Sequence, residues 1–285
     1  MNYRHAFHAG NHADVLKPVV LLALLDALRR KDSPFFVLDT HAGRGRYRLQ
    51  GEEAGRTGEA AGGVLRLAGA VDLPPAVARY LEAVAALNPD GGLQVYPGSP
   101  LLAAQALRGE DRLAACELQP EEAAALKALF AGDARVAVHA RDGYAAVRAL
   151  LPPRHQGRRF GRGLVLVDPP YEAQEAEYPQ VTAAVREALE RWPQGMCAVW
   201  YPIKQRRQLA PFFRALRALP ARQVLLAELL VRPDDSPLRL NGSGMALVNP
   251  PWKFDQVLAP ALPALRDRLG GAGASTRLEW IKREA

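Results

Sequence analysis

Apolar runs and helical patterns follow one another in a regular order between residues 112 and 168. The apolar runs lie at 112–118, 135–139 and 164–167, and the helical patterns between them lie at 120–130 and 143–150. The last run is too short for a helix and does not alternate with polar residues, which is typical of a strand buried on both faces. This strand–helix–strand order predicts a mainly parallel sheet with right-handed crossovers.

The flanking segments extend this pattern in both directions. A helix is predicted from Asp14 to Arg29, with Asp14 as its cap, and an apolar strand follows at 35–39. Further strands are predicted at 196–201, 223–231, 244–248 and 277–281, with helices at 204–219 and 255–269. The second and third of these strands are consistent with an antiparallel hairpin at the edge of the sheet. Together the elements predict an α/β, Rossmann-like fold: a seven-stranded, mostly parallel sheet with helices on both faces.

One stretch, residues 49–92, interrupts this order and shows no strand pattern. Two helical stretches, 59–70 and 75–87, lie there between glycine-rich and proline-rich breaks. The stretch is too long for an ordinary connection, so we predict a helical insertion subdomain at 49–92 on a main domain formed by 1–48 and 93–285. A role in substrate choice and a role in stability alone both remain open for the insertion.

The strand predicted at 164–167 ends abruptly in Asp168-Pro-Pro-Tyr171. The prolines end the strand because neither has an N–H to donate to a neighbouring strand. A carboxylate (Asp168), a backbone carbonyl (Pro169) and an aromatic ring (Tyr171) therefore lie at the carboxyl edge of the sheet, where open α/β sheets bind ligands. Asp168 and the Pro169 carbonyl can both accept hydrogen bonds from one exocyclic amine, and Tyr171 can stack on a flat base. We predict an amine-modifying site; an ordinary strand end followed by a turn is the alternative.

Acidic residues also end the other early strands. The strand that ends at Asp39 is followed by a turn containing Gly43 and Gly45, which lets the backbone approach a ligand closely. Glu117 and Asp142 follow the next two strands. The first is placed to accept ribose hydroxyls and the second an adenine amino group, so these strand ends predict a nucleotide-like ligand.

Two other motifs have simpler interpretations. Asn249-Pro-Pro-Trp252 resembles the first tetrapeptide, but it follows a late strand away from the glycine turn, and we interpret it as a structural strand end. His5, His8 and His12 have a helix-compatible spacing, but Gly10-Asn11 breaks the helix that would align them and no acidic or cysteine ligand joins them. No metal site is predicted.

Composition narrows the class of partner. The chain has 285 residues with a formal net charge of +7 and a pI of about 9.6, which favours a polyanionic partner such as nucleic acid. The basic segments Arg154–Arg162 and Lys204–Arg207 are candidates for binding it, and a solvated basic surface is the alternative for both. No signal peptide or membrane-spanning segment is predicted, and the two cysteines form no disulfide framework. We expect a cytoplasmic protein without a membrane partner.

With these motifs assembled, the chain resembles class I S-adenosylmethionine-dependent methyltransferases that methylate amines, whose signature is (Asp/Asn/Ser)-Pro-Pro-(Tyr/Phe/Trp). Within them it resembles the bacterial 23S rRNA adenine-N6-methyltransferase J family. The segments that carry the resemblance are 3–17, 38–47, 96–100, 168–171, 243–245 and 249–253, so it extends over essentially the whole chain.

The resemblance implies methylation of the N6 amino group of one adenosine in 23S rRNA by a monomer without metal, acting on protein-free rRNA or an early assembly intermediate. S-adenosylmethionine would be the cofactor and S-adenosylhomocysteine the product. Tyr3 and His5 would approach the target base. Pro18 stands where the family has a second histidine, so that side-chain contact with the cofactor is lost unless the backbone makes it. The residues implied for the methyl-donor site are Lys17, Pro18, His41, Ser99, Glu117, Asp142, Gly143 and Asp168, beside the turn glycines Gly43 and Gly45.

Three alternatives stay open on the sequence. A DNA adenine-N6 methyltransferase shares the tetrapeptide, but the chain has no obvious additional target-recognition domain. A non-catalytic RNA-binding protein that retains the fold is expected to have lost part of the motif set, and this chain keeps it. An NAD-dependent enzyme is disfavoured because Arg48 stands where the dinucleotide fingerprint needs a small residue.

Overall fold

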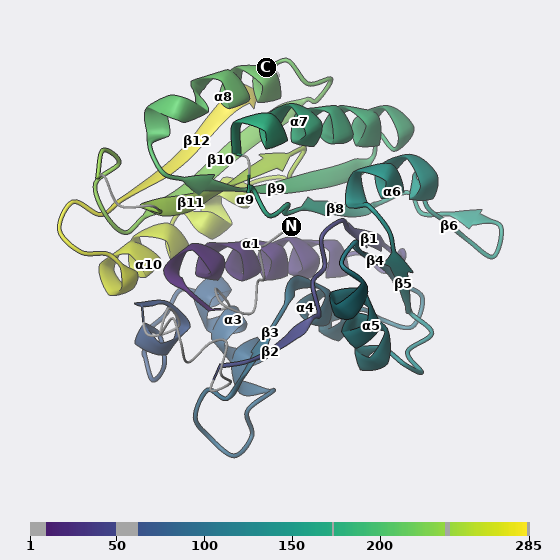
Figure 1. The fold of residues 1–285 in the computed structure, drawn as a ribbon, viewed down its shortest axis with the longest axis horizontal. Helices are drawn as coiled ribbons and strands as arrows, with labels where there is room; N and C mark the ends of the chain where they lie inside the picture. The colour runs from purple at the N-terminus through teal and green to yellow at the C-terminus, as the bar shows by residue number, and fades with distance from the viewer. Residues whose placement is uncertain (1–9, 50–61, 173, 237–239, 284–285) are drawn as a thin grey trace.

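The computed structural model describes residues 10–49, 62–172, 174–236 and 240–283. An eight-stranded sheet runs through it in the order β12-β10-β11-β9-β8-β1-β4-β5, with helices on both faces (Figure 1). The predicted α/β, Rossmann-like fold is confirmed, with one strand more than the seven predicted. The strands are β1 Phe36–Asp39, β4 Arg112–Glu117, β5 Val136–Ala140, β8 Gly163–Val167, β9 Gly195–Ile203, β10 Gln223–Leu230, β11 Gly242–Val248 and β12 Ser275–Arg283.

The strand directions separate a parallel region from an antiparallel one. β5, β4, β1, β8 and β9 are parallel to one another, and β11 pairs with β9 in the antiparallel direction. β10 and β11 form the predicted antiparallel pair. Its predicted place at the sheet edge is wrong, because β11 also pairs with β9 and β10 also pairs with β12. Burial explains the interior position of this pair. All residues of β11 and all but the first of β10 are buried, and strands that are buried along their length have a neighbour on both sides.

Two hydrophobic layers hold the helices against the sheet. One contains α1 (His12–Arg29), α4 (Ser99–Ala106) and α10 (Ala261–Leu269), together with residues of α5 (Pro120–Leu129). The other contains α6 (Gly143–Leu150), α7 (Gln174–Arg191) and α8 (Ala210–Arg217). None of the helices within the described ranges is long and apolar enough to span a membrane.

Three helix predictions need correction. The cap of α1 is Asn11, whose side chain accepts a hydrogen bond from Asp14 N at 2.8 Å, and not Asp14 itself. The helix predicted at 255–269 is divided into α9 (Phe254–Leu258) and α10, because Pro260 at the boundary has no N–H to continue the first helix. The helix predicted at 204–219 begins as a 3-10 turn, η4 (Arg206–Leu209), before α8.

The described part of the insertion packs against α1 and shares its core. Its helix α3 (Pro75–Ala85) matches the prediction, but the described part of the stretch predicted at 59–70 holds only the 3-10 turn η3 (Val64–Arg66). Gly63 lets the chain before η3 approach the start of α1, since a Cβ there would lie 2.0 Å from the Gly10 carbonyl oxygen. Strands β2 (Arg46–Arg48) and β3 (Val95–Pro97) pair at its base, and its apolar residues belong to the same core cluster as α1. The boundaries 1–48, 49–92 and 93–285 stay a prediction.

Candidate active site

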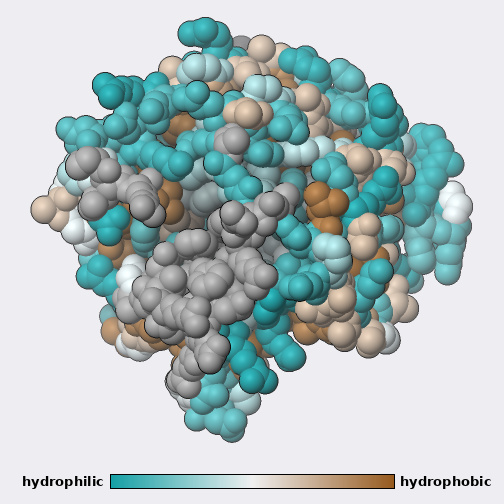
Figure 2. All heavy atoms as spheres, viewed as in Figure 1, coloured by the Kyte–Doolittle hydropathy of each residue, from teal (hydrophilic) through white to brown (hydrophobic). Residues whose placement is uncertain are grey.

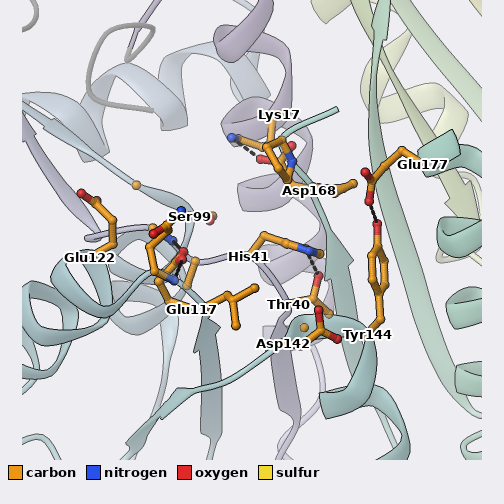
Figure 3. Close-up of a pocket in the computed structure, with 18 of the residues that line it drawn as sticks. Lys17, Thr40, His41, Ser99, Glu117, Glu122, Asp142, Tyr144, Asp168 and Glu177 are labelled. Atoms are coloured by element: carbon orange, nitrogen blue, oxygen red, sulfur yellow. Dashed lines mark hydrogen bonds and ion pairs between the residues drawn. The ribbon is translucent and has the colours of Figure 1, made fainter. Parts of the chain in front are cut away.

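A cavity of about 270 Å³ lies at the carboxyl edge of the parallel strands. From β1 the chain continues to β4 and β5 on one side and then returns to β8 and β9 on the other, so the cavity lies where the strand order reverses, the usual ligand site of such sheets. Its walls come mainly from the loops that follow β1, β4, β5 and β8 (Figure 3). The lining residues that the sequence predicted are Lys17, His41, Gly43, Ser99, Glu117, Asp142, Gly143, Asp168 and Pro169.

Five predicted residues lie elsewhere or cannot be placed, and one of them, Tyr171, is described below. Gly45 does not line the cavity: at φ +78° it packs against α5, where a Cβ would lie 2.7 Å from Leu129 Cδ2. Pro18 borders a smaller hollow that shares Lys17 and Ser99 with the main cavity. Tyr3 and His5 lie outside the described residues.

Lys17 and Asp168 form the central ion pair of the site (Figure 3). Lys17 Nζ lies 2.6 Å from Asp168 Oδ2 and 3.0 Å from Asp14 Oδ1, and Lys17 is 7% exposed. Helix α1 thus delivers a buried cation to the end of β8, which orients the Asp168 carboxylate and leaves Oδ1 outside this ion pair. Charge-assisted hydrogen bonds of this kind are short and geometrically restrictive.

Glu117 and the glycine turn form the opposite wall. The Glu117 carboxylate accepts hydrogen bonds from Gly43 N at 2.8 Å and Gln119 N at 2.7 Å. Gly43 has φ +60°, and a Cβ there would lie 2.2 Å from the Tyr47 hydroxyl. Burial raises the pKa of Glu117, and the two backbone donors hold its oxygens at the cavity wall.

Helix α6 begins directly at the cavity. Asp142 is its cap, with Oδ1 accepting from Ala145 N at 2.7 Å. Gly143 allows the helix to approach β1 closely, because a Cβ there would lie 2.0 Å from the Thr40 carbonyl oxygen. This close packing brings the Asp142 carboxylate to the cavity rim.

Asp39 lies buried at the end of β1 and does not line the cavity. Burial raises its pKa to about 7 and the charge of Asp168 adds to the rise, whereas Ser99, Lys17 and the backbone of His41 oppose it. Asp39 therefore interacts with residues of the cavity wall and not with the cavity itself.

His41 is neutral at physiological pH. Burial lowers its pKa to about 4, against the opposing charges of Asp168 and Asp142. Its Nδ1 lies 2.8 Å from Thr40 Oγ1, and its ring meets Tyr144 edge-on at 5.1 Å. His41 thus forms part of the cavity wall without adding positive charge to it.

Tyr171 is placed differently from its neighbours in the tetrapeptide. It is 5% exposed, does not line the cavity, and its hydroxyl donates to the Trp200 carbonyl at 2.6 Å. Its ring packs near Tyr178 and Trp200, and its φ of +50° is unusual for a bulky residue. Base stacking by Tyr171 stays a prediction.

Tyr144 and Glu177 are among the cavity-wall residues that sequence reasoning missed. The Tyr144 hydroxyl donates to Glu177 Oε1 at 2.5 Å and bridges α6 to α7 (Figure 3). Tyr144 directly follows Gly143, so its position after a strand-end acid was an available signal. Glu177 lies within α7 and has no such signal.

Two further motifs lie at the other edge of the sheet. Asn249-Pro-Pro-Trp252 follows the antiparallel β11, whose end pairs with the start of β9, so the motif lies away from the cavity as predicted. Its interpretation as a structural strand end stays a prediction. Arg154–Arg162 contains a small hairpin, β6 (Arg154–His155) and β7 (Arg158–Arg159), and leads into the start of β8. By contrast, Lys204–Arg207 follows β9 at the cavity edge, with Arg206 paired to the buried Glu228 at 3.0 Å.

The comparisons with known proteins agree over the full chain. Residues 32–282 match the family described as "Ribosomal RNA large subunit methyltransferase D, RlmJ". Two relatives are named "Ribosomal RNA large subunit methyltransferase J": one from Haemophilus influenzae, 43% identical over all of both chains, and one from Escherichia coli, 42% identical over 99% of both. A crystal structure of a Legionella pneumophila protein superposes with a TM-score of 0.86 at 33% identity, covering 95% of this chain and 98% of the other.

The Rossmann-like sheet, with its cavity where the strand order reverses and an Asp-Pro-Pro-Tyr strand end, defines a class I methyltransferase. Within that class, the chain belongs to the ribosomal RNA large-subunit methyltransferase family RlmJ. The resemblance inferred from the sequence motifs is therefore confirmed.

Proposed function

We propose that this protein transfers a methyl group from S-adenosylmethionine to the N6 amino group of an adenosine in 23S rRNA. The observation that carries the proposal is that Asp168 and Pro169, which follow each other in the chain, both line the cavity. They supply a carboxylate and a carbonyl whose following residue, Pro170, has no N–H. The names of the Haemophilus and Escherichia relatives supply the substrate class, ribosomal RNA of the large subunit.

The residues of the cavity fit this cofactor. S-adenosylmethionine carries positive charge on its sulfonium and its amino group, and the lining of the cavity is mainly acidic. The cavity is lined by five acidic side chains against one lysine in the described chain: Glu117, Glu122, Asp142, Asp168 and Glu177, with Lys17. Glu117 would hold the ribose hydroxyls and Asp142 the adenine amino group, with Lys17, His41, Gly43, Ser99 and Gly143 completing the donor site.

The protein's own groups orient the amine. When bound, the cofactor supplies an electrophilic methyl group; Asp168 and the Pro169 carbonyl accept the two N–H bonds of the substrate amine and direct its lone pair away from themselves. Positive charge that develops on the amine lies beside the Asp168 carboxylate, which is held by Lys17 at 2.6 Å. A methylated aromatic amine is acidic enough to lose its proton readily, so positioning and electrostatic stabilisation supply most of the rate.

The substrate must present an unstacked adenine, because an amine inside a helix cannot reach the cavity. We propose that Tyr3 and His5 approach the base from the N-terminal segment and that Tyr171 supports it at the strand end. Protein-free 23S rRNA or an early assembly intermediate would expose such a base. The monomer contains the complete set of proposed donor-site residues, so no second copy is needed.

Replacing Asp168 by alanine tests the site directly. The variant keeps the fold but loses the oxygen that accepts from the amine, and we expect turnover on rRNA to fall at least a hundredfold, or about 3 kcal/mol in transition-state free energy. Asp133→Ala, a matched change in a turn before β5 where Asp133 pairs with Arg135, should keep its activity. Full turnover by Asp168→Ala would refute the assignment.

The choice of substrate needs a parallel assay. Labelled S-adenosylmethionine should be offered with protein-free 23S rRNA, with assembled subunits and with duplex DNA. We expect label in the free rRNA. Label in DNA alone would establish the DNA-methylating alternative, and RNA binding without any transfer would establish the non-catalytic one.

A further inference from the structure

The corner formed by Asn249-Pro-Pro-Trp252 exposes a large aromatic ring. Trp252 is 82% exposed, the most of any large hydrophobic residue in the described chain. The corner is firmly held: the Asn249 side chain accepts hydrogen bonds from Arg222 N at 2.9 Å and Gln223 N at 3.3 Å, and Asn249 has φ +51°. A fixed, solvent-exposed indole contributes nothing to the core, so its display asks for another explanation.

A cation lies over this ring, since Lys253 Nζ is 4.2 Å from the Trp252 ring centroid. Gln223 at the start of β10 pairs with Arg283 at the end of β12, which brings the C-terminal basic residues near the corner. The segments 217–223, 249–253 and 280–283 contain no acidic residue, and the neighbouring Asp255 accepts a hydrogen bond from Trp280 Nε1 at 3.3 Å. We call this surface the Trp252 patch, defined by Trp252, Lys253, Arg222, Lys282 and Arg283.

The patch lies at the amino ends of the parallel strands, whereas the cavity lies at their carboxyl ends. Across the sheet, Val248 of β11 pairs with Cys197 of β9, and Cys197 pairs with Val165 of β8. Val165 precedes Asp168 by three residues, so the corner begins about 10 Å from Asp168, measured along the strands. From Val248 the chain leads further away from the cavity edge. In Figure 1 the C-terminal end of β12 lies beside α8, far from α4 and α5.

We propose that the Trp252 patch is a second RNA-binding surface, on which an unpaired base stacks on the indole while neighbouring phosphates contact the basic side chains. Stacking on an exposed aromatic ring tolerates any base, and basic side chains follow the backbone. RNA fits better than a protein partner because the other exposed large hydrophobics, Leu65, Val71 and Leu118, belong to other elements and form no apolar surface with Trp252. The identity of the polyanion as RNA rests on the proposed function.

The test measures affinity for 23S rRNA fragments of decreasing length around the methylated adenosine. Trp252→Leu keeps an apolar side chain but removes the stacking ring, and Lys253→Glu reverses the charge. Each should raise the Kd for long fragments about tenfold, and Lys253→Glu should also weaken the dependence of binding on salt. Trp252→Phe, which keeps a ring, and Lys127→Glu, a matched change on exposed α5, should bind within twofold of the wild-type protein.

Fragment length separates this surface from the active site. The affinity defect should disappear for fragments too short to reach both edges of the sheet, and turnover at saturating RNA should stay unchanged in every variant. Wild-type affinity of Trp252→Leu and Lys253→Glu for long fragments would overturn the proposal. RNA binding that depends on Trp252 without methyl transfer would leave the patch standing while the proposed function fails, and a wild-type protein that binds no RNA would refute both.

Discussion

At the scale of single residues, the strand-end acids were the most predictable part of the site. Glu117, Asp142 and Asp168 each follow an apolar run, and the carboxyl ends of parallel strands meet at one edge, so their positions follow from the pattern alone. The partner of Asp168 did not follow from it. Lys17 lies 151 residues away in the sequence, and only packing of α1 across the sheet brings its ammonium group to the carboxylate.

The position of Asp39 at a strand end was predictable, but the effect of burial on its pKa was not. Its folded pKa, about 7, is above the ordinary value of 3.8, so the folded protein binds more protons than the unfolded chain between these values. Stability should therefore fall as pH rises through this range, by up to about 1.4 kcal/mol per pH unit from this group alone.

Asp39→Asn should remove this contribution. We expect its stability relative to the wild-type protein to increase from pH 4 to pH 7, measured by urea unfolding without cofactor. The comparison with wild type is needed because the lowered pKa of His41 gives an opposite slope over part of the same range. If the unfolding free energies of the two proteins changed in the same way with pH, the pKa of Asp39 would not be raised in the folded state.

At the scale of elements, hydrophobic patterns predicted the sheet but not all of its ends. The runs that became β4, β8 and β10 were visible because their apolar residues are continuous. The division of the last helix at Pro260 and the short η3 turn depend on local backbone limits that a periodic pattern hides. The interior place of β10 and β11 depends on β12, a long-range pairing that no local pattern specifies.

The junction of β1 with α6 gives a test at this scale. Gly143→Ala would force a Cβ to within 2.0 Å of the Thr40 carbonyl oxygen, so α6 must shift and carry Asp142 away from the cavity. We expect a loss of about 1–3 kcal/mol in unfolding free energy and clearly weaker cofactor binding. Gly109→Ala is the matched control, since a Cβ there has no atom within 4 Å. Equal behaviour of the two variants in calorimetry and cofactor titration would contradict this account of the junction.

At the scale of the whole molecule, strand direction assigns the motifs to two edges. Asp168-Pro-Pro-Tyr171 follows a parallel strand and lies at the cavity, whereas Asn249-Pro-Pro-Trp252 follows an antiparallel strand and lies at the opposite edge. The late position of the second motif in the chain predicted that the two lie apart, but their place at opposite ends of the strands depends on the antiparallel direction of β11. In the face shown in Figure 2, hydrophilic residues predominate and hydrophobic ones form small groups, in keeping with the net charge of +7 and a large polyanionic partner.

The chemistry at the cavity edge is the central claim, and the product nucleoside tests it most directly. Protein-free 23S rRNA should be methylated with labelled S-adenosylmethionine, digested to nucleosides and separated. We predict that the label is recovered as N6-methyladenosine and that Asp168→Ala lowers its yield at least a hundredfold. Label recovered as a ribose-methylated or carbon-methylated nucleoside would contradict the account, because Asp168 and the Pro169 carbonyl would then have no amine to orient.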